Sequence, residues 1–328
     1  MRYNKQYSIV ICLLLAQNWS LYAQGVTASS DADSISVRVS AVDQENRLIT
    51  NLSKDDISLS GDDTVHGVSG LELRTNVAAT LALLIDNSVS MEHVLPLVKG
   101  ASEVFVKGFV RRGHDQAAIL SLAERVQVEQ QLTDDVGLLR AAISGVKFTP
   151  PPDYIGGGVH ILRNPPPTKS TPPQPGSTGL WDAVASASKI LSNAVPGSQR
   201  VVILFSDGVD TSSRMKLDEA IAEAIKYDVA VFAVGVADKQ AFQLDTGGLK
   251  RMAERTGGRA FFPKKVDELP VILGQIDQEL RSHYVLTFRP ERGKARTNLR
   301  RLKIEVTNPA RKKEKLQLAY KRGYFHQN

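Results

Sequence analysis

Side chains that carry oxygen follow the ends of apolar segments at several points in the sequence. Asp86, Ser88 and Ser90 stand at alternate positions directly after the apolar run 79–85, and such positions can point the same way as the chain turns. Carboxylate and hydroxyl oxygens are the ligands that a hard divalent cation prefers. With two oxygens from later segments, the full candidate ligand set is Asp86, Ser88, Ser90, Thr178 and Asp207.

The composition of this set favours Mg²⁺ or Mn²⁺, with Ca²⁺ less favoured, because it contains no His or Cys. Two carboxylates would balance the charge of the cation, while the neutral hydroxyls leave it able to attract a further anionic oxygen. The single cysteine, Cys12, excludes a cysteine-based zinc or iron–sulfur site. The residue types therefore predict a metal site that receives an acidic group.

The elements that must position these residues form a regular series between residues 76 and 282, where short apolar runs alternate with amphipathic stretches. This alternation predicts an α/β domain with a doubly wound, mostly parallel sheet, in which ligands bind beyond the carboxyl ends of the strands. The expected strands are 79–85, 116–122, 126–132, 201–205, 229–236 and 260–262, and the expected helices are 94–109, 136–146, 180–194, 217–227, 249–255 and 269–280.

Residues 24–75 and 283–328 flank this domain and contain short runs in which apolar and polar residues alternate, as in half-buried strands. Because an isolated hairpin is only marginally stable, we expect the two segments to pair into one smaller β domain from which the α/β domain protrudes. Inside the α/β domain, residues 149–177 hold nine of the fifteen prolines. Such a segment cannot form a helix or a central strand, so we expect an inserted loop beside Thr178.

The first residues have the features of an export signal. Arg2 and Lys5 precede an apolar stretch that is short for a bilayer span, and Ala23 offers a cleavage point, which predicts a signal peptide over residues 1–23. We therefore expect an exported protein, periplasmic or secreted, without a stable membrane span after cleavage. An uncleaved N-terminal anchor is the alternative.

Charge is unevenly distributed along the chain. The formal net charge is +6, and residues 292–322 alone hold twelve Lys or Arg against two Glu. A basic tail of this kind can bind nucleic acid, anionic polysaccharide or lipid head groups. The alternation of Leu302, Ile304 and Val306 with charged residues instead favours solvated strands. Since export makes nucleic acid an unexpected partner, we expect a protein or an acidic glycan that offers a carboxylate.

From residue 78 to residue 282 the chain resembles the von Willebrand factor type A domain. The metal-ion-dependent adhesion site of that family uses Asp-x-Ser-x-Ser, a distant Thr and a later Asp followed by Gly, and the five residues named above fill these positions. The resemblance implies that the two Ser and the Thr bind the metal directly, that the two Asp act partly through water, and that a partner carboxylate completes an octahedron. It also implies that the last helix, 269–280, shifts when the site changes state. The flanking segments resemble the exported bacterial subgroup of such proteins.

These observations predict a non-catalytic, metal-dependent binding module for adhesion or scaffolding. The alternative is a phosphoester or ester hydrolase that uses the same cation, which would need a nucleophile with its base, or a second metal. No Gly-x-Ser-x-Gly, His-Glu-x-x-His or phosphate-binding glycine loop is present, and the six His are scattered. We expect His93 to be a surface residue and Asp182 and Asp210 to cap helices or to support the ligands.

Overall fold

The computed structural model describes residues 34–62, 64–123, 125–150, 154–156, 159–160, 178–237, 243–290 and 299–325. The backbone of Tyr154–Gly156 (β8) and Val159–His160 (β9) forms a short antiparallel pair. The predicted signal peptide and the rest of the segment 151–177 lie outside the described residues. Ile35–Asn328 belong to one compact unit, which contains every helix and strand discussed below.

The central sheet of the α/β domain has six strands in the order β12-β11-β10-β5-β6-β7. All neighbours are parallel except β6 and β7, which form an antiparallel pair at one edge. The mostly parallel sheet predicted from the sequence is therefore present, with β5 and β10 side by side at its centre. The strands span Ala79–Asp86 (β5), Gln116–Leu122 (β6), Val126–Thr133 (β7), Gln199–Ser206 (β10), Val229–Gly235 (β11) and Ala260–Phe261 (β12).

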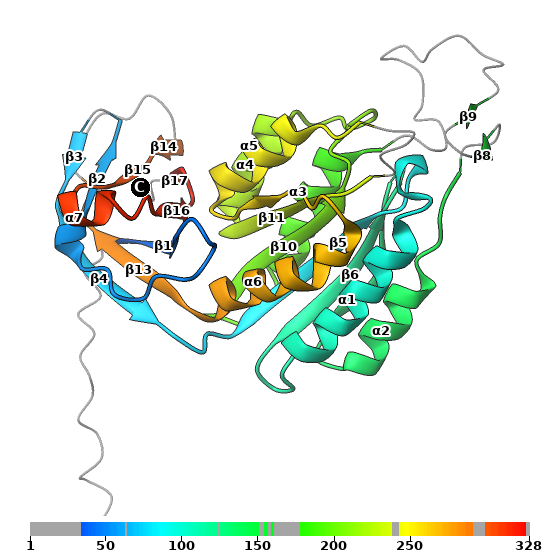
Figure 1. Ribbon diagram of the computed structural model, residues 1–328, viewed down its shortest axis with the longest axis horizontal. Helices are drawn as coiled ribbons and strands as arrows, with labels where there is room; N and C mark the ends of the chain where they lie inside the picture. The colour runs from blue at the N-terminus through cyan, green and yellow to red at the C-terminus, as the bar shows by residue number, and fades with distance from the viewer. Residues whose placement is uncertain are drawn as a thin grey trace, which may run out of the picture. The chain divides into compact units, whose positions relative to one another are not determined.

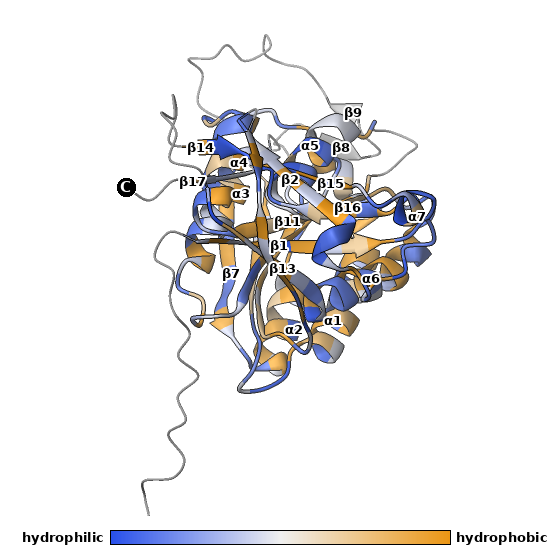
Figure 2. Cartoon of the chain, turned by 90° about the vertical axis from the view of Figure 1, so that its left-hand side faces the viewer, coloured by the Kyte–Doolittle hydropathy of each residue, from blue (hydrophilic) through white to orange (hydrophobic). Residues whose placement is uncertain are grey.

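Helices cover both faces of this sheet (Figure 1). Alternate residues of a strand face opposite sides, so Leu83 packs into one apolar core and Leu84 into the other. Helices α1, α2 and α6 contribute to the first core and α3, α4 and α5 to the second. The helices span Leu95–Phe109 (α1), Val136–Gly145 (α2), Leu180–Leu191 (α3), Leu217–Lys226 (α4), Thr246–Thr256 (α5) and Leu269–Arg281 (α6). Buried on both faces, the central strands are hydrophobic along their length, as β11 is in Figure 2.

Strands from the two ends of the chain form smaller antiparallel sheets. One has the order β16-β1-β13-β4, another the order β15-β2-β3, and β14 pairs with β17. N-terminal strands pair with C-terminal ones, β1 with β13 and β16, and β2 with β15, and their apolar side chains share one core. The elements span Ile35–Val42 (β1), Ile57–Gly61 (β2), Thr64–His66 (β3), Val68–Arg74 (β4), His283–Phe288 (β13), Leu299–Arg301 (β14), Lys303–Val306 (β15), Pro309–Lys312 (α7), Gln317–Tyr320 (β16) and Gly323–Phe325 (β17).

The α/β domain leaves and rejoins these sheets through two neighbouring strands. β4 ends at Arg74 and leads into β5, and β13 begins at His283 directly after α6. In the antiparallel ladder of these two strands Arg74 is the partner of His283, and Leu73 is the partner of Tyr284. The entry and the exit of the α/β domain are therefore held side by side by one strand pair.

The structure differs from the sequence prediction in a few elements. Helix α5 begins at Thr246 rather than at Leu249, because the Asp245 carboxylate accepts hydrogen bonds from the N–H groups of Gly247 and Gly248 and so caps the helix three residues earlier. Strands β3 and β4 are not among the predicted strands, and the short helix α7 connects β15 with β16. No helix in the described part of the chain is long and apolar enough to cross a bilayer.

Candidate metal centre

The loop that follows β5 gathers three of the predicted ligands. Asp86 ends the strand and is fully buried. Its Oδ1 atom accepts a hydrogen bond from the Ser88 backbone N–H (2.9 Å), and its Oδ2 atom accepts one from the Ser206 hydroxyl (2.7 Å). A short 3-10 turn, Val89–Met91, then folds the chain back and leaves the hydroxyl oxygens of Ser88 and Ser90 3.3 Å apart. One carboxylate and two hydroxyls thus share a small buried volume.

The loop that follows β10 brings a second carboxylate to the same place. Asp207 accepts a hydrogen bond from the Val209 N–H (2.9 Å) and is hydrogen-bonded to the Ser90 side chain. Gly208 has a φ angle of 84°, and a Cβ atom at this position would lie 2.5 Å from the backbone oxygen of Asp245. The turn therefore requires glycine, and through it Asp207 is held against the loop that follows β5.

Thr178 lies just before α3, against the residues that follow Asp207. Its N–H donates to the Thr211 hydroxyl (2.7 Å), and its carbonyl oxygen accepts from the N–H groups of Thr211 (2.9 Å) and Ser212 (3.1 Å). The Thr178 residue is buried, as are the other four predicted ligands. The structure therefore places all five at the carboxyl edge of the central sheet, on the loops after β5 and β10 and at the start of α3.

Asp86 and Asp207 are two buried carboxyl groups whose charges no cation offsets in the described part of the chain. Burial, followed by repulsion from Asp207, raises the pKa of Asp86 to about 6. Burial also raises the pKa of Asp207, although hydrogen bonds from Val209 and Ser90 act in the opposite direction. No cationic side chain of the described residues is among the main causes of either shift. A bound cation would relieve both the burial of charge and the repulsion between the two groups.

The donor set at this edge contains oxygen only. Among the described residues no group of three or more His, Cys, Asp or Glu side chains could hold a metal ion. The candidate centre differs from such a group because Ser and Thr hydroxyls outnumber its two carboxylates. These residues fit a hard divalent cation that binds oxygen, such as Mg²⁺ or Mn²⁺.

Asn87 lies in the loop that follows β5, which carries Asp86, Ser88 and Ser90 and is called the metal loop below. It connects this loop with the start of the proline-rich insertion. Its side-chain Nδ2 donates to the carbonyl oxygen of Lys147 (2.6 Å) and to the Thr149 hydroxyl (3.1 Å), and the Thr149 N–H donates to its carbonyl oxygen (3.0 Å). No local sequence pattern marks Asn87 for this role, because its partners lie about 60 residues further along the chain. The insertion thus departs beside the metal loop and rejoins the described chain at Thr178.

Two further acidic residues support the site from outside. The Asp210 carboxylate accepts from the N–H of Leu180, the first residue of α3 (2.9 Å), and so caps that helix. Asp182 accepts from the N–H groups of Arg214 and Met215 and fixes the chain that leads to α4. Both carboxylates are occupied by backbone donors, in line with the supporting roles predicted for them. His93 has an exposed side chain beside Glu92, in agreement with its prediction as a surface residue.

Two family models, both for the von Willebrand factor type A domain, match residues 81–210 and residues 169–275. The chain contains a von Willebrand factor type A (VWA) domain. The matched ranges begin in β5 and end in α6, so the VWA domain corresponds to the α/β part of the fold. No curated protein matches the sequence significantly.

Solved structures similar to this chain include proximal thread matrix protein 1 from the mussel byssus, with 18% identity, a TM-score of 0.49, and coverage of 67% of this chain and 51% of that chain. A second structure of that protein is described as having a zinc-occupied metal-ion-dependent adhesion site (MIDAS) motif. It has 16% identity and a TM-score of 0.46, and the match covers 63% of this chain and 49% of that chain. The von Willebrand factor type A protein from Catenulispora acidiphila is similar at 13% identity, with a TM-score of 0.48 and coverage of 76% and 72%. The present chain thus spans about half of the mussel protein chain.

Proposed function

We propose that the VWA domain is a non-catalytic binding module that holds a divalent cation through Asp86, Ser88, Ser90, Thr178 and Asp207. The observation that supports this most directly is the buried pair Asp86 and Asp207, which meets Ser hydroxyls and no cationic side chain of the described chain. In the proposed site the hydroxyls contact the cation directly, and the carboxylates act partly through water. The bound cation keeps one coordination position for an acidic group of a partner, which binds to it directly.

The proposed cation is Mg²⁺ or Mn²⁺. Zinc, which the mussel structure is described as holding, is usually bound through nitrogen and sulfur ligands. The set in this chain offers oxygen alone, and most of that oxygen is neutral hydroxyl, which suits a small, hard cation that keeps part of its water shell.

The proposed partner is a protein or an acidic glycan outside the cytoplasm. The signal-peptide pattern of residues 1–23 supports export to the periplasm or the medium. The side chains that form hydrogen bonds at the site in the described structure support a binding role rather than hydrolysis. They are Asp, Ser, Thr and Asn, and none is a His or Lys that could act as a general base to activate a nucleophile.

The first test is calorimetry of the purified protein with Mg²⁺, Mn²⁺ and Ca²⁺. The wild type is expected to bind Mg²⁺ or Mn²⁺, and the double variant Ser88→Ala, Ser90→Ala is expected to lose that binding. Ser188→Ala is the matched control, because Ser188 is also a fully buried serine, but its hydroxyl donates to Val184 within α3. No uptake of any of the three cations by the wild type would refute the proposed site.

The second test addresses the partner and the rival hydrolase activity. Capture from the native cell envelope in Mg²⁺ and in EDTA should recover a partner only in Mg²⁺, and the Ser88→Ala, Ser90→Ala variant should recover none. A turnover screen with phosphate esters and carboxylic esters, run with both proteins, is expected to show no metal-dependent hydrolysis. Turnover that disappears in the double variant would favour the hydrolase.

A further inference from the structure

Strand β16 has one edge that no other strand covers in the described structure. It lies at the end of the sheet β16-β1-β13-β4, and β1 is its only strand partner there. Directly after β16 the chain is tied down, because the Arg322 N–H donates to the Arg255 carbonyl (2.9 Å) and the Arg322 carbonyl accepts from Leu302 (2.9 Å). The open edge is therefore Gln317–Ala319, where alternate residues turn their N–H and C=O groups outward.

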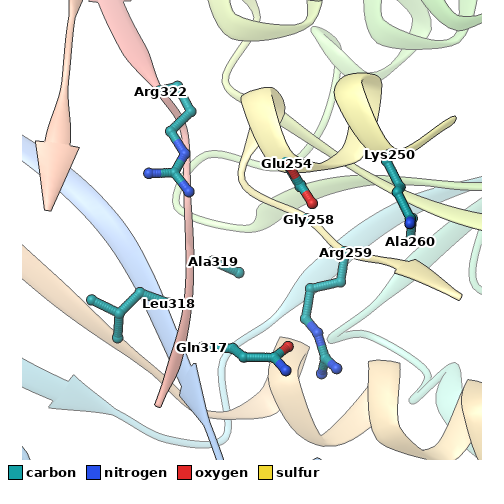
Figure 3. A pocket seen from close by; sticks show the side chains of 9 residues that line it. All are labelled: Lys250, Glu254, Gly258, Arg259, Ala260, Gln317, Leu318, Ala319 and Arg322. Carbon is teal, nitrogen blue, oxygen red and sulfur yellow. The ribbon is translucent and has the colours of Figure 1, made fainter. Parts of the chain in front are cut away.

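Two hollows border this strand. The first, of about 380 Å³, lies between β16 and the segment formed by the end of α5 and the start of β12. Figure 3 shows it with Arg322, Ala319 and Gln317 on the β16 side and with Lys250 and Glu254 on the α5 side. The second, of about 320 Å³, lies between β16 and β15. Leu318 and Arg322 line both, so space is open on both sides of the strand.

The hollows are surrounded by positive charge that the described chain does not neutralise. Lys250 and Arg322 line the first hollow, and Lys312 and Lys315 line the second together with Arg322. None of these four side chains takes part in an ion pair with a described residue, whereas Glu305, in the second hollow, is paired with Lys303 (2.8 Å). Glu254 is the one acidic residue that remains in the first hollow, so cations predominate.

The position of these cations argues against a purely protective role. Edge strands are commonly shielded from aggregation by Lys or Pro within the strand itself. Gln317–Tyr320 contains neither, and the cations lie outside the strand: Lys250 on α5, Lys312 and Lys315 at the end of α7 and just after it, and Arg322 two residues after β16. Helix α7 is coloured hydrophilic in Figure 2. The strand edge is therefore uncharged and lies between two hollows that are both lined by Lys and Arg side chains.

We propose that β16 accepts an extended acidic segment of a partner protein by strand addition. The backbone of the added segment pairs with Gln317–Ala319, and its carboxylates reach Lys250 and Arg322 on one side and Lys312 and Lys315 on the other. This surface is separate from the metal centre, since it lies at the carboxyl end of α5, whereas Asp245 at the amino end of that helix bonds to Asp207. Binding at β16 is therefore independent of the cation.

The experiment uses a fluorescent peptide of alternating glutamate and valine, blocked at both ends, and measures its anisotropy with the full-length protein in EDTA. Three peptides are compared: this one, an alternating glutamate–proline peptide that has the same charge but lacks half of the backbone donors, and an alternating lysine–valine peptide. Strand addition predicts saturable binding of the first peptide alone. Equal binding of the glutamate–proline peptide would mean a simple polyanion patch and would overturn the proposal, as would no binding of the first peptide.

A pair of variants locates the surface. Lys312→Glu with Lys315→Glu should weaken binding of the glutamate–valine peptide about tenfold or more, because attraction is replaced by repulsion. Lys313→Glu is the matched control, since this exposed residue follows Lys312 but does not line the hollow, and it should change binding little. Amide hydrogen exchange of Gln317–Tyr320 should slow when the peptide binds to the wild type. Unchanged exchange there, or an equal loss in the control, would overturn the proposal.

Discussion

Gly208 holds the second acidic residue of the candidate metal centre in place, and its conformation is the part of the site most sensitive to substitution. Gly208→Ala combines an unfavourable positive φ with a Cβ placed 2.5 Å from a backbone oxygen. We expect a loss of about 2–4 kcal/mol in the free energy of unfolding, together with loss of Mg²⁺ binding. Urea denaturation and calorimetry measure the two effects.

Gly197→Ala is the control for this prediction. Gly197 also has a positive φ, 82°, but no atom lies within 4 Å of a Cβ built there. Its substitution should therefore cost only the backbone strain, about 1 kcal/mol, and should leave metal binding intact. Equal losses for the two variants would mean that the close approach to Asp245 has no energetic importance.

Asp86 and Asp115 are both fully or almost fully buried, yet their charges have opposite effects on stability. The raised pKa of Asp86 means that its ionised form is less stable in the metal-free fold than in water. Hydrogen bonds from Arg111 and Arg281 hold the pKa of Asp115 well below its usual range, although burial acts in the opposite direction. We expect Asp86→Asn to stabilise the protein in EDTA by about 1–3 kcal/mol, and Asp115→Asn to destabilise it by about 3 kcal/mol.

Chemical denaturation in EDTA measures the free energy of unfolding of both variants. When the measurement is repeated in Mg²⁺, the wild type should be more stable than Asp86→Asn, the reverse of the order in EDTA. The reversal is expected because the variant gives up a ligand of the proposed cation. A metal-free Asp86→Asn protein that is clearly less stable than the wild type would show that the hydrogen bonds of Asp86 outweigh the cost of its buried charge.

Part of this site is readable from the sequence, and the reason is local. Asp86, Ser88 and Ser90 follow a strand end at alternate positions, so their common direction follows from chain geometry. The contribution of Ser206 is different, because its hydroxyl reaches Asp86 from the neighbouring strand, 120 residues further along the chain. No local pattern marks a serine at the end of a strand for such a role.

Among the elements, helix α6 is the candidate for transmitting the state of the metal centre to the β sheets. Its carboxyl end is firmly attached, since Arg281 donates to Asp115 (2.7 Å) and to the Phe109 carbonyl (2.6 Å) and stacks on the Phe109 ring (4.2 Å). Any displacement should therefore be largest toward the amino end of the helix. We predict that Mg²⁺ changes amide hydrogen exchange in Leu269–Ile276 more than in Asp277–Arg281. Identical exchange with and without the metal would exclude this relay.

The proline-rich insertion is the element that we expect to confer selectivity. Its first residue bonds to Asn87 in the metal loop, and it rejoins the described chain at Thr178. Shortening the stretch between Pro150 and Gly176 should change which partner is recovered from the envelope while leaving Mg²⁺ affinity within about a factor of three, since the anchoring residues are kept. Loss of metal binding in the shortened protein would contradict this division of roles.

The sequence pattern predicts an element well where both faces of a strand are buried. It predicts an element poorly where the strand forms only by pairing with a segment far away in the sequence. The inner strands β5, β10 and β11 are largely continuous apolar runs, which few other structures accommodate, whereas the edge strand β7 is partly polar and exposed. Strand β4 alternates irregularly, contains Gly70, and is half exposed, and its pairing with β13 joins residues more than 200 positions apart. Helix α5 has two glycines of low helix propensity directly after its first residue, so only its cap at Asp245 reveals where it starts.

At the scale of the whole molecule, the buried His283 should make the fold sensitive to mild acid. Burial, followed by the charges of Arg38 and Arg74, lowers the pKa of His283 to about 3. The folded state therefore keeps the ring neutral, whereas the unfolded chain takes up a proton near pH ~6.5. The stability contributed by the neutral ring is complete above that pH and is lost as the pH falls toward 3, by at most about 1.4 kcal/mol per pH unit.

Urea denaturation at pH ~7 and pH ~5 is the corresponding measurement. His283→Gln, which removes the titrating group, should flatten the dependence on pH in this interval. Asp115 contributes in the same direction only at lower pH, because its own pKa is held below the ordinary value for an aspartate. Asp86 acts in the opposite direction in this interval, because its pKa is raised to about 6, so the decisive comparison is between His283→Gln and the wild type. The same pH dependence in both proteins would show that the ring reaches solvent and is protonated without unfolding.

The paired strands β4 and β13 also decide how the molecule would respond to tension. A partner held at the metal centre pulls on the α/β domain, and the domain transmits that load to both of its connections at once, at Arg74 and His283. The two strands are loaded at the same end and in the same direction, so the load does not separate them from each other and is passed from β13 to its other neighbour, β1. The attachment should therefore hold until the β1–β13 ladder slides as a whole, rather than peel open from the Arg74–His283 rung.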